Sequence, residues 1–219
     1  MKLGAADARP GDSPQRIGVL ISGRGSNLAA ILAAREAGRL PAPVVLVIAN
    51  VPGAPGLEHA RAHGVPTAVV DHRASASRDE HDRALAAHLR GAGVSVVCLA
   101  GYLRLLSPAF IREFAGRILN IHPSLLPSFP GLHAQRQALA RGVRITGCTV
   151  HVVDEGLDSG PILLQAAVPV EAGDDEERLA ARILAAEHQL YPEALRLFCT
   201  ARFAIAGGVA RVVPESVRR

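Results

Sequence analysis

An amide and an imidazole lie two residues apart near the middle of the chain, in the segment Asn120-Ile121-His122. If this segment is a strand, its period of two points Asn120 and His122 to one side and Ile121 to the other. An amide can donate a hydrogen bond to a developing oxyanion, and an imidazole can donate or accept a proton. The segment therefore predicts acyl transfer through a tetrahedral intermediate, although a histidine satisfied within the core is the ordinary alternative for His122.

A carboxylate near His122 would favour the charged form of its imidazole. Three acidic side chains in one predicted turn are candidates for this partner: Asp154, Glu155 and Asp158. Asp158 is followed by Ser-Gly-Pro, where the chain must reverse, but an aspartate is also common in turns that have no function. The spacing alone leaves all three candidates open.

A glycine-rich turn with the sequence Ser-Gly-Arg-Gly-Ser-Asn occupies residues 22–27, between the first predicted strand and the first predicted helix. Backbone N–H groups and the helix dipole can hold an anion at such a junction, and a plain capped turn is an equal alternative. The turn lacks the Gly-Lys-Ser/Thr ending of a Walker loop. The second predicted strand ends in Asn50 rather than in the acid that holds a dinucleotide ribose. A small phosphorylated substrate is therefore favoured.

The remaining histidines do not form a convincing metal pattern. His59 and His63 share one face of a predicted helix, but the glutamate of an H-E-x-x-H motif is missing. His133 and His151 lack carboxylate or cysteine partners at ligand spacing. We expect no metal site.

The composition indicates one cytoplasmic domain without a nucleic-acid or membrane partner. The chain has 219 residues, 49% of them hydrophobic, and its net charge of +4 comes from basic residues spread along its length rather than clustered. No apolar segment approaches about 18 residues, and residues 1–15 contain no continuous apolar run, so we expect a disordered leader there. An odd number of cysteines without a C-x-x-C pair favours free thiols: Cys98, Cys148 and Cys199.

Short apolar runs alternate with helical patterns in the first half of the chain. Strands are expected at 17–21, 44–49, 67–70 and 94–100, with helices at 27–37, 56–63 and 78–90 between them. This spacing predicts parallel strands joined by right-handed crossovers. Ligands of such sheets lie at the carboxyl ends of the strands.

The second half has a different rhythm. A helix at 134–141 precedes two runs at 146–153 and 161–170, which a turn separates as in an antiparallel pair. Asp174, with Glu177 three residues later, predicts the N-cap of a helix that runs to about residue 199. Gly207-Gly208 then breaks the tail at 202–219 and suits a terminal hairpin. The expected fold is α/β: a Rossmann-like parallel sheet extended by antiparallel strands into a mixed sheet, with helices on both faces.

Together these segments resemble the folate-dependent formyltransferase family that acts on glycinamide ribonucleotide (GAR). The resemblance covers roughly residues 16–201, and its motifs lie at 22–27, 100–108, 120–127, 130–133, 149–161 and 187–192. It implies a single domain at 16–201, with a nucleotide-binding half at about 16–115 and a folate and catalytic half at about 116–201. The stretch before Gln15 matches nothing in the family.

The resemblance implies transfer of the formyl group of 10-formyltetrahydrofolate to the amine of GAR, in de novo purine biosynthesis. It implies no metal, and a monomer or homodimer. It also implies a cis peptide bond between Leu126 and Pro127. By position, it assigns catalysis to Asn120, His122 and Asp158; GAR binding to Gly25, Ser26, Asn27 and Glu187; and folate binding to Arg78, Leu103, Arg104, Leu105, Leu106, Asn120, Val153 and Asp154.

Four other functions are alternatives. A formyltetrahydrofolate hydrolase would use nearly the same catalytic residues with water as the acceptor, and it would usually carry an N-terminal regulatory domain. A methionyl-tRNA formyltransferase would carry a further C-terminal domain. A binding module without catalysis is disfavoured because Asn120, His122 and Asp158 are all present. A dinucleotide-binding domain is disfavoured by Asn50.

Overall fold

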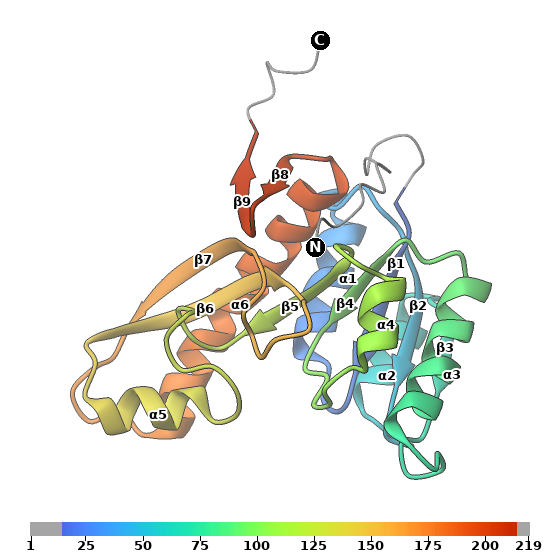
Figure 1. Ribbon diagram of the computed structural model, residues 1–219. Coiled ribbons are helices and arrows are strands. Elements are labelled where there is room, and N and C mark those ends of the chain that lie inside the picture. The colour runs from blue at the N-terminus through green and yellow to red at the C-terminus, as the bar shows by residue number, and fades with distance from the viewer. Residues whose placement is uncertain (1–14, 214–219) are drawn as a thin grey trace.

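A seven-stranded mixed sheet runs through the protein in the order β3-β2-β1-β4-β5-β6-β7 (Figure 1). The computed structural model describes residues 15–213, so the expected leader, except for Gln15, lies outside the described residues. The strands are β1 (Ile17–Ile21), β2 (Val44–Ala49), β3 (Thr67–Val69), β4 (Val96–Leu99), β5 (Ile118–His122), β6 (Ile145–Val152) and β7 (Ile162–Pro169). Strands β1 to β5 pair in parallel, while β6 pairs antiparallel with both β5 and β7. The predicted mixed sheet is confirmed.

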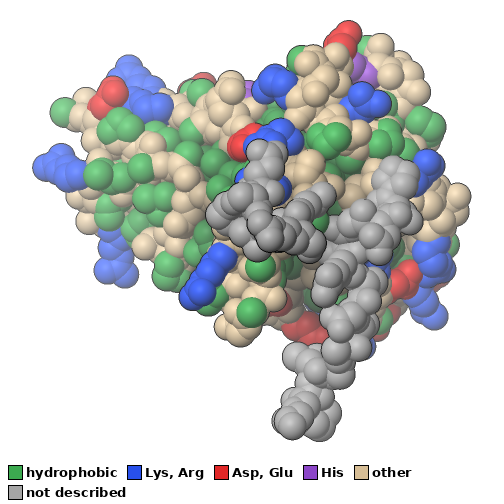
Figure 2. Space-filling view, turned by 90° about the horizontal axis from the view of Figure 1, so that it is seen from above, with side chains coloured by type: hydrophobic (Ala, Val, Ile, Leu, Met, Phe, Trp, Pro, Cys, Tyr) green, Lys and Arg blue, Asp and Glu red, His purple; other side chains and the backbone are tan. Residues whose placement is uncertain are grey.

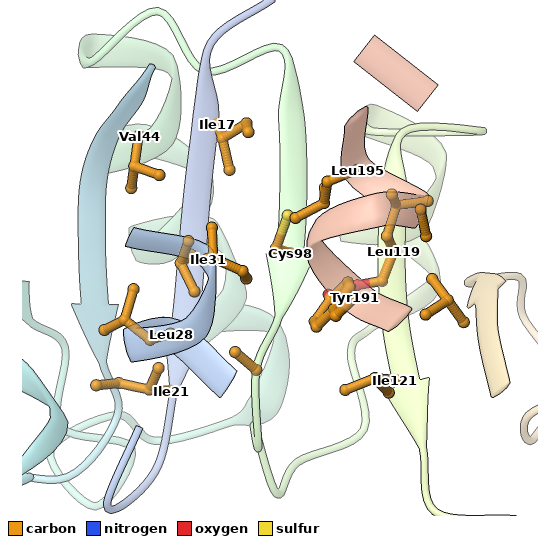
Figure 3. Packing of buried hydrophobic residues seen from close by; sticks show 14 of the residues in the cluster. Ile17, Ile21, Leu28, Ile31, Val44, Cys98, Leu119, Ile121, Tyr191 and Leu195 are labelled. Atoms are coloured by element: carbon orange, nitrogen blue, oxygen red, sulfur yellow. The ribbon is translucent and has the colours of Figure 1, made fainter. Parts of the chain in front are cut away.

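Helices cover both faces of the sheet, as the all-apolar strand β1 requires. They are α1 (Ser26–Glu36), α2 (Gly56–Ala62), α3 (Arg78–Gly91), α4 (Pro108–Glu113), α5 (Ala134–Arg141) and α6 (Glu176–Cys199). One core cluster packs α1, α2 and α6 against the sheet, and a second packs α3 and α4 against the other face. Figure 3 shows part of the first cluster, with Tyr191 of α6 beside Leu119 of β5.

The start of α6 and the short helix α4 differ from the sequence-based expectations. The N-cap of α6 is Asp175, whose side chain accepts from the Arg178 N–H at 2.8 Å. The predicted cap, Asp174, instead pairs with Arg182 at 2.7 Å and accepts from the Glu171 N–H. The short helix α4 was not expected; it begins after Ser107, whose hydroxyl accepts from the Phe110 N–H.

The sheet order brings the loops that follow β1 and β4 side by side. The Ser22 N–H donates to the Gly101 carbonyl at 3.1 Å, and the Ser22 hydroxyl accepts from the Leu103 N–H at 2.9 Å. The glycine-rich turn at 22–27 therefore lies against the segment at 101–107. Both loops lie at the carboxyl edge of the parallel strands, where ligands of such sheets bind.

The tail forms the expected hairpin from β8 (Phe203–Ala206) and β9 (Val209–Val212), joined by Gly207 and Gly208. Figure 2 views the molecule from the side of this hairpin and shows Arg side chains dispersed among hydrophobic and uncharged ones. None of the helices within residues 15–213 is long and apolar enough to cross a membrane.

Candidate active site

The end of β5 carries the two side chains predicted to act together. In the antiparallel pairing with β6, Asn120 lies opposite His151 and His122 lies opposite Thr149. Ile121, between them, packs into the core cluster under α6. The prediction that Asn120 and His122 face one side of a strand is confirmed.

His122 is held between two acceptors. Its Nε2 lies 2.8 Å from the Phe129 carbonyl oxygen, and its Nδ1 lies 3.3 Å from Asp158 Oδ2. A neutral imidazole can donate through only one nitrogen, so the doubly protonated ring satisfies both partners at once. The residue is only 5% exposed, which limits the access of water to this pair.

Asp158 is the predicted carboxylate that lies beside His122. Its backbone has a φ of 50°, in the left-handed region, and its Oδ2 also accepts from the Gly131 N–H at 2.8 Å. The other two candidates point elsewhere. Asp154 accepts from Gly156 and Ser159 within its own turn, and Glu155 pairs with Arg112 at 3.0 Å.

His151 is a site residue that sequence analysis missed, since it was considered only as a metal ligand. Its Nε2 lies 3.2 Å from Asn120 Nδ2 and 3.6 Å from Asp158 Oδ1, and its Nδ1 lies 3.2 Å from the Val152 carbonyl oxygen. Burial lowers the pKa of His151 below its ordinary 6.5, against the opposing effect of the Asp158 charge. The missing signal was the register between β5 and β6, which residue spacing does not reveal.

The other suggested metal ligand, His133, lies 3.9 Å from Glu176 with its side chain largely exposed. Within residues 15–213, no three His, Cys, Asp or Glu side chains are grouped so that they could hold a metal.

A buried hydrogen-bond network holds the loop that contributes the Phe129 carbonyl. The Thr149 hydroxyl donates to the Ser124 carbonyl at 2.7 Å and accepts from the Leu126 N–H at 3.0 Å. The Gln165 amide donates to the Leu126 carbonyl at 2.9 Å. The Leu126–Pro127 peptide bond is cis, as the resemblance implied.

The glycine-rich turn forms the N-terminal end of α1. Gly25 has a φ of 70°, and a Cβ built on it would lie 2.7 Å from Gly56 Cα, so only glycine fits there. Asn27, in the first turn of the helix, is buried and donates to Glu187 Oε2 at 2.7 Å. Burial raises the pKa of Glu187 to about 7. The structure thus joins an amide and a carboxyl group from opposite ends of the chain beside the turn.

The residues assigned to folate surround the loop after β4. Leu103 and Leu105 are exposed at 75% and 66%, whereas Leu106 is buried in the second core cluster and Arg104 is partly buried. Val153 donates its N–H to the Ile118 carbonyl, which keeps the turn that carries Asp158 close to β5. Arg78 is exposed at the first position of α3. Two large apolar side chains open to solvent beside a polar site are typical of a binding surface.

A protein-family model described as formyl transferase matches residues 15–195. The chain belongs to the formyl transferase family. Asn120, His122 and Asp158 all fall within the matched residues of this formyl transferase, as do the glycine-rich turn and Glu187. The terminal hairpin lies beyond the match.

Over most of its length, the formyl transferase is similar to proteins whose names specify formyl transfer to glycinamide ribonucleotide. It is 47% identical to the phosphoribosylglycinamide formyltransferase of Escherichia coli strain K12, over 84% of this chain and 87% of that protein. A crystal structure of glycinamide ribonucleotide transformylase 1 from Symbiobacterium toebii is 55% identical, covers 92% of this chain and 95% of that one, and has a TM-score of 0.90.

Longer relatives also match. The chain is 48% identical to the trifunctional purine biosynthetic protein adenosine-3 of Drosophila pseudoobscura pseudoobscura, over 93% of its own length. It spans only 15% of the length of that protein. This formyl transferase is therefore similar to one part of a larger relative and to nearly all of the bacterial ones.

Proposed function

We propose that this protein transfers the formyl group of 10-formyltetrahydrofolate to the amine of GAR, giving formyl-GAR and tetrahydrofolate in de novo purine biosynthesis. The observation that carries the proposal is the contact of His122 with Asp158 at 3.3 Å, on the strand face that also presents Asn120. The names of the bacterial relatives support GAR as the acceptor. The three free cysteines suit an enzyme that works in the cytoplasm.

In the proposed reaction the GAR amine attacks the formyl carbon, and the carbonyl oxygen becomes an oxyanion. The Asn120 amide and the His122 imidazolium donate hydrogen bonds to this oxygen, while Asp158 holds the imidazolium in its charged form. The bond from the formyl carbon to N10 of the folate then breaks, and the proton lost by the amine reaches N10 through water. One well-placed donor to an oxyanion lowers the barrier by about 3 kcal/mol.

The proposed GAR site is the glycine-rich turn with its helix. The N–H groups of Gly25, Ser26 and Asn27 bind the phosphate, because the first N–H groups of α1 have no partner within the helix and the helix dipole favours an anion there. Glu187, which accepts a hydrogen bond from Asn27, contacts the same substrate.

The proposed folate site is the loop after β4. The exposed Leu103 and Leu105 and the buried Leu106 supply apolar contacts, and the turn at 153–158 contacts the bound folate. Asp154 shapes that turn, while Arg78 and Arg104 offer positive charge to an anionic folate.

The test is to incubate purified protein with 10-formyltetrahydrofolate, with and without GAR, and to follow tetrahydrofolate release and product mass. We expect release only with GAR, and formyl-GAR as the product. Formate without GAR would identify a hydrolase instead. Folate binding without any release would leave a binding module.

A further inference from the structure

We propose that His151 is a positioning residue that orients the Asn120 amide so that its nitrogen donates to the oxyanion. The inference rests on the proposed function, since the oxyanion is that of the formyl group. His151 contacts Asn120 rather than the reacting atoms in this arrangement, and it lies directly opposite Asn120 across the β5–β6 pair.

The donor and acceptor atoms of the two side chains determine which of them donates the hydrogen bond. Asn120 Nδ2 and His151 Nε2 are 3.2 Å apart, and an amide nitrogen can only donate. His151 Nε2 must therefore accept, which means that it carries no proton. The ring proton is then on Nδ1, where the Val152 carbonyl oxygen accepts it at 3.2 Å. His151 is neutral, with its proton on Nδ1.

The neutral ring decides which end of the Asn120 amide faces it. One N–H of the amide is used by His151, and the second N–H on the same nitrogen remains to donate to substrate. Without an acceptor at this position, the amide can turn over and exchange its nitrogen for its oxygen, which would repel an oxyanion. The orientation of Asn120 therefore depends on the bare Nε2 of His151.

Protonation of His151 would disturb both catalytic partners. A proton on Nε2 removes the acceptor for Asn120 and creates a donor 3.6 Å from Asp158 Oδ1. Asp158 would then be shared between His151 and His122, whose Nδ1 lies 3.3 Å from Asp158 Oδ2. The titratable groups around His151 are Asp158, His122 and Asp154. Asp158 and Asp154 favour protonation of His151 and His122 opposes it, and burial outweighs the two carboxylates, so the ring stays neutral near neutral pH.

An irregularity of β6 lies directly beside His151. The pairing of β6 with β7 shifts register between Val150 and His151, and such bulges re-aim the side chain that follows. His151 is 2% exposed, so water does not replace it as a partner of Asn120.

The experiment compares two substitutions by steady-state kinetics with GAR and 10-formyltetrahydrofolate. In His151→Gln the glutamine oxygen can accept from Asn120 but cannot titrate, whereas His151→Leu has no acceptor. We expect His151→Leu to lower kcat at least about tenfold with KM for both substrates nearly unchanged. His151→Gln should keep most of kcat and hold it to lower pH than the wild type does. His88→Leu, at an exposed position of α3, controls for loss of a histidine.

Two further measurements separate orientation from a merely structural role. In an Asn120→Ala background, His151→Leu should have little further effect on kcat, because the two residues act as one unit. The proposal would be overturned if His151→Gln and His151→Leu lowered kcat equally. It would also be overturned if substitutions at His151 and Asn120 had independent effects on kcat.

Nitrogen NMR of the histidine rings tests the inference without an activity assay. We expect His151 to have a protonated Nδ1 and a bare Nε2 at neutral pH, and a proton on Nε2 would reject the inference. A wild-type protein that makes no formyl-GAR would instead reject the proposed function, whatever the NMR result.

Discussion

Each oxygen of Asp158 lies near a different imidazole. Oδ2 lies 3.3 Å from His122 and accepts from the Gly131 N–H, while Oδ1 lies 3.6 Å from His151. The three side chains come from a strand, its antiparallel partner and the turn after that partner. A change at Asp158 therefore acts on charge as well as on geometry.

We expect Asp158→Asn to lower kcat about 100-fold or more, because an amide cannot compensate the charge of the His122 imidazolium. Thermal unfolding should shift little, since the amide oxygen can still accept from Gly131. Glu155→Gln, in the same turn but paired with Arg112 on the surface, serves as the control and should keep wild-type kcat. Near-normal turnover of Asp158→Asn would reject its catalytic role.

Glu187 makes stability depend on pH. Burial raises its pKa from 4.5 to about 7, so the folded protein holds this proton more tightly than the unfolded chain does. The stabilisation of the folded protein by this proton is therefore fully present below about pH 4.5, is lost as the pH rises through about 7, and stays lost above that. Its size is up to about 3 kcal/mol.

Glu187→Gln should remove this decline, and the variant should unfold at higher urea concentration than the wild type at pH 8. The measurement is urea unfolding at pH 5 and pH 8 for both proteins. Glu177→Gln, exposed in the first turn of the same helix, should leave the wild-type decline in place. If the unfolding free energy fell equally between pH 5 and pH 8 in the wild type and in Glu187→Gln, Glu187 would not be the source of the pH dependence.

At the scale of elements, the junction of β1 with α1 depends on close backbone contact. Gly25 takes a left-handed conformation against Gly56, and the Gly56 N–H donates to the Gly23 carbonyl at 3.0 Å. The turn is thus supported by the start of α2, a different element.

Gly25→Ala should cost about 1–2 kcal/mol of unfolding free energy and raise KM for GAR about tenfold or more, because its Cβ must displace Gly56 and turn the N–H groups away from the phosphate. Gly23→Ala is the matched control, since its Cβ would have no neighbour within 4 Å and its φ is not positive. Calorimetry and the GAR dependence of the initial rate provide the readouts. An unchanged KM in Gly25→Ala would argue against a phosphate at this turn.

At the scale of the whole molecule, one hydroxyl ties the last helix to the centre of the sheet. Tyr191 of α6 is fully buried, and its hydroxyl lies 3.1 Å from the Leu99 carbonyl oxygen and 2.9 Å from that of Leu119. These carbonyls belong to β4 and β5, the strands that lead into the proposed folate and catalytic residues.

Tyr191→Phe should lower the free energy of unfolding by about 1–2 kcal/mol, because two buried carbonyls lose their shared donor. Since the substitution removes no group from the proposed site, kcat should stay near the wild-type value. Urea unfolding and the formyl-transfer assay measure the two quantities. A stability equal to that of the wild type would show that the hydroxyl makes no net contribution.

Local patterns in the sequence were enough to predict the positions of most helices and strands. The helix expected at 134–141 and the strands expected at 17–21 and 44–49 match α5, β1 and β2 residue for residue. The shared side of Asn120 and His122 followed from the strand period alone. The expected runs at 67–70 and 94–100 extend beyond β3 and β4, because Val70, Val94 and Ala100 are apolar but lie outside the paired residues. Each successful inference depended on neighbours within a few residues of one another.

The partners of those residues were decided only by the tertiary structure. Three carboxylates within five positions were equivalent in sequence, and the turn after β6 directs only Asp158 to His122. The register between β5 and β6 placed His151 against Asn120, and the packing of α6 on α1 joined Glu187 to Asn27. Local periodicity determines which way a side chain points along its own element. It contains no information on which distant side chain will lie opposite, because that depends on strand pairing and helix packing across the whole chain.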